Sequence, residues 1–272
     1  FQNRFMRRFW ENNIDTHILI GNHDCYYKNT NKVNAVNNLC TTYDKINEPF
    51  IYENPKIATF DGVYILLMPW ICDDNYDRSV HLLKNAEVNL VFGHFEIAGF
   101  EMDRGNVCHG GIDKQPLNKY DVVLTGHFHH KSNDGHIYYV GTPGEMTWAD
   151  YNDPRGFHIF DTDTRELERI INPYTIFEKV YYDETTTNYS SFDVLTLRDK
   201  FVKIGVVNKK DFYQFDKFID KVLSESGAHE VKIVEDFSEL DASNVSDEIV
   251  ENAEDTMTVL ERYIDELDVE LD

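Results

Sequence analysis

The chain has 272 residues, 42% of them hydrophobic, which is enough for one large α/β domain and a smaller addition. No stretch approaches the roughly 18 consecutive apolar residues of a membrane span, so we expect a cytoplasmic protein with no membrane partner. The net charge of −23 disfavours a protein that binds nucleic acid through charge alone.

The first part of the chain predicts a layered α/β domain. Residues 1–13 place apolar side chains at helical spacing, and short apolar runs then predict buried strands. These strands are expected at 17–20, 63–68, 89–92, 122–124, 137–140, 157–160 and 167–171. Helical or loop segments separate the early runs, which is typical of α/β architecture. We place this domain at residues 1–182.

A second, smaller domain is expected at residues 183–240, because the composition turns polar near residues 183–191. A strand at 201–207, a helix at 211–224 and a strand at 230–234 predict a small α/β cap.

Residues 241–272 are expected to form an acidic helical tail, because their apolar residues recur at helical spacing. Residues 235–272 hold fifteen Asp or Glu and one basic residue, so they supply −14 of the net charge and leave −9 for the rest. A body of that charge can still bind DNA when divalent metal ions neutralise its cleft. The acidic face of the tail is either a solvated surface or a docking site for a partner.

Three histidine-bearing sequences each follow an expected strand directly. They are Gly-Asn-His-Asp at residues 21–24, Gly-His-Phe-Glu at 93–96 and Gly-His-Phe-His-His at 126–130. Loops at the carboxyl ends of strands in an open α/β sheet converge on one crevice, so these sequences are expected to meet. Histidine and asparagine are ligands for manganese, iron or zinc more than for magnesium alone. The three sequences together therefore predict a metal site, although one Gly-His alone would be a weak signal.

The order of these motifs resembles that of the calcineurin-like metallophosphoesterases. Further segments resemble the SbcD-type DNA-repair nucleases, in particular the recombination endonuclease subunits of T-even-like phages. These segments are Met68-Pro69-Trp70, Gly99-Phe100, Gly141-Thr142-Pro143 and the run Asn-Asp-Pro-Arg-Gly-Phe at 152–157. The matches span residues 14 to about 165. The resemblance implies a four-layer α/β/β/α core, with the cap serving as a DNA-binding domain.

The resemblance also implies two divalent metal ions, with manganese preferred. Asn22, His94 and His127 would bind one ion, and His129 would bind the other. The ions would generate a hydroxide and stabilise both the attacking and the leaving oxygen.

Catalytic and substrate-binding roles follow from the same resemblance. His23 would act at the scissile phosphate, with Asp24 orienting its ring. Arg155 and His130 are expected to contact the substrate.

Two motifs of the resembled family do not follow any expected strand here. The family carries Asp-x-His after its first strand and Gly-Asp after its second. Asp-Thr-His at 15–17 and Asp-Gly-His at 134–136 precede their strands, so we reject both as ligands. We therefore expect the first two strands to lie upstream of this sequence, one ion site to be incomplete, and this chain to be a weak or inactive nuclease.

The expected function is that of a DNA exonuclease and endonuclease subunit in a phage recombination-repair complex, located in the host cytoplasm. DNA and an SbcC-like coiled-coil ATPase are the expected partners, with the tail as a possible ATPase-docking segment, and the chain is expected to form a homodimer. One alternative is another metallophosphoesterase, either a phosphodiesterase or a phosphatase, because these share the metal motifs. The other alternative is a noncatalytic DNA-binding scaffold.

Overall fold

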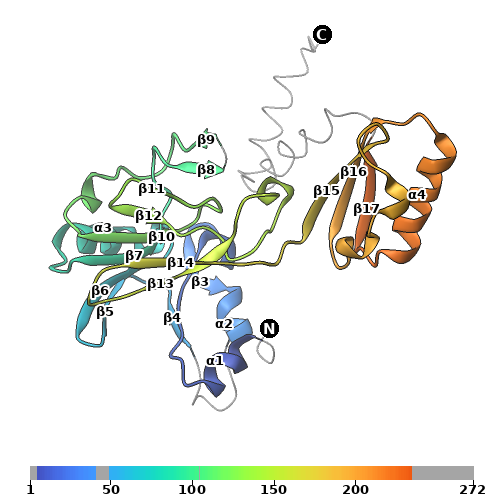
Figure 1. The fold of residues 1–272 in the computed structure, drawn as a ribbon. Helices are drawn as coiled ribbons and strands as arrows, with labels where there is room; N and C mark the ends of the chain where they lie inside the picture. Colours follow the sequence, from blue (N-terminus) through green and yellow to red (C-terminus); the bar gives the residue numbers. More distant parts are fainter. Residues whose placement is uncertain (1–4, 41–48, 104, 235–272) are drawn as a thin grey trace, which may run out of the picture. The chain divides into compact units, whose positions relative to one another are not determined.

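The computed structural model describes residues 5–40, 49–103 and 105–234, and these fall into two compact units (Figure 1). The first unit contains the described residues up to 143 together with 154–171, and the second contains 144–153 and 172–234. The acidic tail at 241–272 and the end of the cap lie outside the described residues. None of the described helices has the length and apolarity required to span a membrane.

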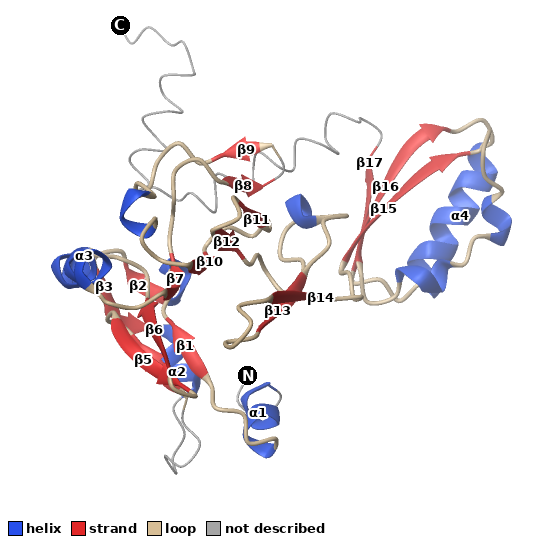
Figure 2. Ribbon diagram, turned by 60° about the vertical axis from the view of Figure 1, so that its left-hand side comes forward, coloured by secondary structure: helices blue, strands red, loops and turns tan. Residues whose placement is uncertain are grey.

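A six-stranded sheet forms the centre of the first unit, with the strand order β11-β12-β10-β7-β6-β5 (Figure 2). The parallel strands are β6 (Val63–Met68), β7 (Leu90–His94), β10 (Val122–Gly126) and β12 (Ile137–Tyr139). The antiparallel edge strands are β5 (Lys56–Phe60) and β11 (Ser132–Asn133). The central strands carry buried side chains on both faces, which is why they read as continuous apolar runs.

The two faces of this sheet pack against different elements. On one face, Leu66 and Val91 join Leu83 of helix α3 (Tyr76–Asn85) in a buried cluster. On the other face, Ile65 and Leu90 pack with residues of β1 (His17–Leu19), β4 (Phe50–Tyr52) and β13 (Gly156–Phe160). β1 pairs in parallel with β4, and β13 pairs antiparallel with β14 (Leu167–Ile171). The expected α/β fold class is therefore confirmed.

The remaining elements of the first unit are short and partly polar. They are α1 (Arg7–Glu11), β2 (Cys25–Tyr27), β3 (Thr30–Asn34), α2 (Ala35–Cys40), β8 (Glu101–Asp103) and β9 (Asn106–Val107). Among these the sequence indicated only the N-terminal helix.

The second unit is built on a parallel sheet of three strands in the order β15-β16-β17. These are β15 (Phe177–Asp183), β16 (Phe201–Asn208) and β17 (Glu230–Val234), and helix α4 (Phe212–Glu225) lies between the last two in the chain. Asp211 begins the helix by accepting the backbone N–H groups of Tyr213 and Gln214. We had placed residues 172–182 in the first domain, whereas β15 pairs with β16, so this segment belongs with the second unit.

Truncation of a buried side chain in the six-stranded sheet should destabilise the protein. Leu66 is fully buried in β6, whereas Tyr64 on the same strand is 61% exposed. We expect Leu66→Ala to lower the free energy of unfolding by about 2–5 kcal/mol. Tyr64→Ala should cost much less, and urea unfolding of both variants measures the difference. Equal losses would contradict the packing described here.

Candidate metal centre

The candidate centre lies where strands β7 and β10 end side by side. The parallel register pairs Gly126 with His94, so His94 and His127 leave the sheet at the same level. β1 reaches this edge as well, because the Trp70 N–H donates to the Ile20 carbonyl at 2.7 Å. The turn Asn22–Asp24 follows β1 directly. Three of the expected loops therefore meet within the first unit.

Asn22, His94 and His127 converge on one point. The Oδ1 atom of Asn22 lies 2.8 Å from Nε2 of His94 and 3.2 Å from Nδ1 of His127. The two ring nitrogens lie 3.4 Å apart. Each neutral ring carries one proton, so the two rings cannot make all three contacts as hydrogen bonds at once, and the three atoms form a donor set suited to a metal ion.

The packing around these rings leaves little freedom. Trp70 stacks on His127, with ring centroids 5.3 Å apart and planes 16° apart. A Cβ atom at Gly21 would lie 2.8 Å from Cε1 of His94, so a side chain there would displace the ring. The close approach of Gly21 thus restrains the ring of His94, and the stacking of Trp70 restrains the ring of His127.

Both histidines are held in their neutral form. Burial, together with the nearby His127 and His23, lowers the pKa of His94 to about 3. Burial, together with His23 and His129, lowers the pKa of His127 to about 4. Neutral imidazole is the form that binds metal ions, so these two rings are ready to act as ligands near pH 7.

His127 also has an unusual backbone conformation. Its φ angle is +92°, a region that residues other than glycine rarely adopt. Such a conformation costs on the order of 1–3 kcal/mol and persists where the surrounding structure demands it. Here it turns the chain sharply at the end of β10 and directs Nδ1 towards Asn22 and His94.

His23 and Asp24 occupy the turn that begins at Gly21. His23 is exposed at this edge, and its charge acts on both buried histidines, so it lies close to them. Asp24 accepts the backbone N–H of Gly21 at 2.7 Å and so closes the turn. The expected role of Asp24 in orienting the ring of His23 stays a prediction.

The remaining expected site residues follow β10. His129 is close enough to His127 to influence its pKa. Nε2 of His130 lies 3.6 Å from a carboxylate oxygen of Glu101. Arg155 is only 5% exposed, and its guanidinium donates to the His129 carbonyl and to the Thr142 hydroxyl. In this arrangement Arg155 supports the loop that carries His129, and its contact with substrate stays a prediction.

The two rejected Asp-x-His sequences make other contacts. Nδ1 of His17 lies 2.8 Å from the Tyr52 hydroxyl, and its ring stacks on Phe50. Asp134 accepts the backbone N–H of His136 in the turn before β12.

The residues present fit part of a metal site. Within the described chain, no three His, Cys, Asp or Glu side chains gather closely enough to hold an ion by themselves. The group has two imidazoles, and its third donor is the amide oxygen of Asn22. This is a neutral nitrogen and oxygen set suited to manganese, iron or zinc. Further ligands would have to be water, substrate or carboxylates from outside the described residues.

Glu96 is a further residue of the site, although the second motif alone indicates no role for it. Oε2 of Glu96 lies 3.8 Å from Nε2 of His127, on the opposite side of the ring from Asn22. The sequence places Glu96 two residues after His94, which suggests that it lies near the site. Its contact with His127 is not evident from the sequence, because His127 is 31 positions away along the chain.

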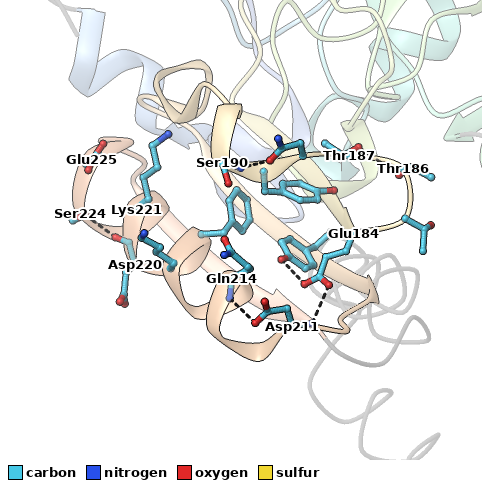
Figure 3. A pocket seen from close by; sticks show the side chains of 16 residues that line it. Glu184, Thr186, Thr187, Ser190, Asp211, Gln214, Asp220, Lys221, Ser224 and Glu225 are labelled. Atoms are coloured by element: carbon cyan, nitrogen blue, oxygen red, sulfur yellow. Dashed lines mark hydrogen bonds between the residues drawn. The ribbon is translucent and has the colours of Figure 1, made fainter.

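The second unit has a hollow of about 820 Å³ between α4 and the loop at residues 184–190 (Figure 3). Its polar side chains serve the fold. Glu184 accepts the Tyr182 hydroxyl and the N–H groups of Lys210 and Asp211, and the Lys221 ammonium donates to the Phe192 carbonyl. We assign no chemistry to this hollow.

The low pKa values of His94 and His127 make stability pH-dependent in the metal-free protein. Below pH 6.5 the unfolded chain binds protons at these residues and the folded chain does not, so stability falls as the pH decreases from 6.5 towards 4. Each histidine contributes up to about 1.4 kcal/mol per pH unit. Urea unfolding at several pH values should give a shallower dependence for His127→Gln. Parallel curves would show that His127 is not held neutral.

No family model matches the chain. A curated relative does: exonuclease subunit 1 of Enterobacteria phage T4 is 32% identical over 253 residues. The alignment covers 92% of this chain and 70% of that protein. The similarity includes nearly the whole described structure and therefore both units. The chain belongs to the family of this phage protein, the SbcD-like exonuclease subunits.

Proposed function

We propose that this chain is a metal-dependent DNA nuclease subunit that hydrolyses phosphodiester bonds. One observation carries the metal dependence: Asn22 Oδ1, His94 Nε2 and His127 Nδ1 lie within 2.8–3.4 Å of one another at the carboxyl edge of the sheet. The T4 relative is named an exonuclease subunit, which supports nuclease activity. We propose two divalent ions, with manganese preferred, as the cofactors.

The residues of the site would divide the chemistry among them. Asn22, His94 and His127 would hold one ion, and His129 would contribute to the second. The bound ions would supply a hydroxide and electrostatic stabilisation at the phosphate. His23 is exposed beside these donors, where it can donate a proton or a hydrogen bond to a phosphate oxygen. Arg155 would hold the loop that carries His129 through its hydrogen bond to the His129 carbonyl.

We further propose the four-layer α/β/β/α core. An apolar hollow of about 430 Å³ lies between β1 and β13, over the face of β7 and β10. Leu19, Phe92, Leu124 and Phe160 are among its lining residues. Strands inserted there would join the two-stranded sheets β1-β4 and β13-β14 into one layer. Such a layer would be more stable, because an isolated two-stranded sheet is only marginally stable. The Asp-x-His and Gly-Asp motifs of the resembled family follow such strands, so the same insertion would bring the missing carboxylates to the site.

The partners are proposed from the family. The relative is named as a subunit, which supports a protein partner, and we propose an SbcC-like ATPase, a homodimer and DNA. The second unit would contribute to DNA binding as a cap. The complex would act in the host cytoplasm.

One alternative function is supported by a specific observation. No carboxylate completes the three-donor group within the described chain, which is what a noncatalytic DNA-binding scaffold would show. A scaffold would bind DNA with the same affinity after chelation of metal. Another metallophosphoesterase would instead hydrolyse a chromogenic phosphate ester and leave DNA intact.

Degradation of linear duplex DNA with manganese is the direct test. It compares this chain with a form in which a segment carrying the Asp-x-His and Gly-Asp motifs is joined before Phe1. In the active form, His23→Ala should lower the rate by about 10²–10⁴-fold, because a positioned proton donor contributes that much. His81→Ala, which changes an exposed histidine on α3, is the matched control. If neither form hydrolyses DNA, and both still bind it after the metal is chelated, the noncatalytic scaffold is supported.

Manganese should also stabilise the folded chain. A ligand at about 100 times its dissociation constant adds about 2.7 kcal/mol to the free energy of unfolding. Thermal unfolding with and without Mn²⁺ should therefore show a higher Tm with the ion, and His94→Ala should abolish the difference. An ion-induced shift that survives in Asn22→Ala, His94→Ala and His127→Ala would place the ion elsewhere.

A further inference from the structure

Glu96 lies next to His127 in a segment whose backbone makes several hydrogen bonds. The Phe95 N–H donates to the Thr125 hydroxyl at 2.9 Å, and the Ile112 N–H donates to the Glu96 carbonyl at 2.8 Å. The hydroxyl of Tyr139 donates to the Phe95 carbonyl at 2.9 Å, and it accepts the Ile97 N–H at 3.0 Å. Tyr139 itself is 1% exposed.

The glutamate side chain is supported as well. The Cys108 thiol lies 3.7 Å from Oε1 of Glu96 and can donate to it. Gly111 approaches the Glu96 carbonyl so closely that a Cβ atom there would lie 2.4 Å from the oxygen. This leaves Oε2 directed towards the ring of His127, 3.8 Å from Nε2. The carboxylate is therefore part of a built arrangement rather than a mobile surface group.

Two acceptors compete for the one proton of the neutral His127 ring. Asn22 Oδ1 lies 3.2 Å from Nδ1, and Glu96 Oε2 lies 3.8 Å from Nε2. A proton on Nδ1 would block the nitrogen that faces His94 and Asn22. A proton on Nε2 would leave the Nδ1 lone pair available to an ion. The tautomer of His127 thus decides whether the three-donor group can bind metal.

We propose that Glu96 is a positioning residue that holds His127 in the Nε2–H tautomer, so that Nδ1 is presented to the ion. The proposal rests on the proposed metal-dependent function. The Glu96 contact has an ion-pair distance of 3.8 Å, longer than the 3.2 Å to Asn22, and a carboxylate attracts an N–H more strongly than an amide oxygen does, so Glu96 favours the Nε2–H form. Carboxylates that accept the second ring N–H of a ligating histidine raise its basicity, and their loss typically weakens metal affinity about 10–100-fold.

The first test is spectroscopic and needs no metal. Nitrogen-15 NMR of the metal-free protein distinguishes the two tautomers of His127, with the signal assigned by His127→Gln. We expect the Nε2–H form in the unaltered chain, and a shift towards Nδ1–H in Glu96→Ala, because Asn22 is then the remaining acceptor of the two. Glu96→Gln should also shift towards Nδ1–H, because its neutral amide oxygen does not offset the shorter distance to the amide oxygen of Asn22. Glu87→Ala removes an exposed glutamate in the same unit and should change nothing.

The second test is calorimetric titration with Mn²⁺ on the same variants. Glu96→Ala should bind at least about tenfold more weakly, and Glu96→Gln should also bind more weakly because it lacks the charge of the carboxylate. An unchanged tautomer and affinity in Glu96→Ala would overturn the proposal. A tautomer and an affinity that are both retained in Glu96→Gln would also overturn it, because the charge of the carboxylate would then play no part. Failure of the unaltered chain to bind Mn²⁺ would instead count against the proposed function, while the tautomer measurement would still decide the role of Glu96.

Discussion

The parallel pairing of β7 with β10 is the interaction on which the candidate centre depends. Its register places Gly126 opposite His94, so the chain leaves both strands at the same level of the sheet. A slip of one residue would turn the side chains of one strand to the other face and separate His94 from His127. The hydrogen bond from Trp70 to Ile20 then joins β1 to the same edge and brings Asn22 to the two rings.

The centre departs from what stability alone would favour. Two partly buried imidazoles lie with their nitrogens close together, one amide oxygen is shared between them, and His127 adopts a positive φ angle. A partly satisfied buried polar group is costly in a low-dielectric interior. Strained backbone and poorly satisfied polar groups often occur together at functional sites, where a bound ligand offsets their energetic cost. The proposed ion would do so here, because it would replace the poor nitrogen–nitrogen contact with bonds to both rings.

The fold and the centre were predictable from sequence where local patterns carry the information. The apolar runs of β7 and β10 and the Gly-His that follows each were enough to expect His94 and His127 together. β15 was missed because its buried residues do not alternate regularly with exposed ones, and because its partner lies 24 positions away, Phe177 with Phe201. The roles of Trp70, Glu96 and Arg155 depend on contacts between distant segments. Periodicity and spacing contain no information about such contacts.

The central claim is that one ion binds to two histidine nitrogens and the Asn22 amide oxygen. Electron spin-echo spectroscopy of Mn²⁺ bound to the chain tests it directly, because imidazole nitrogens bonded to the ion modulate its signal. The account predicts coupling to two histidine nitrogens, and the loss of one in His94→Ala and of the other in His127→Ala. Bound manganese with no nitrogen coupling, or with coupling that survives both substitutions, would contradict it.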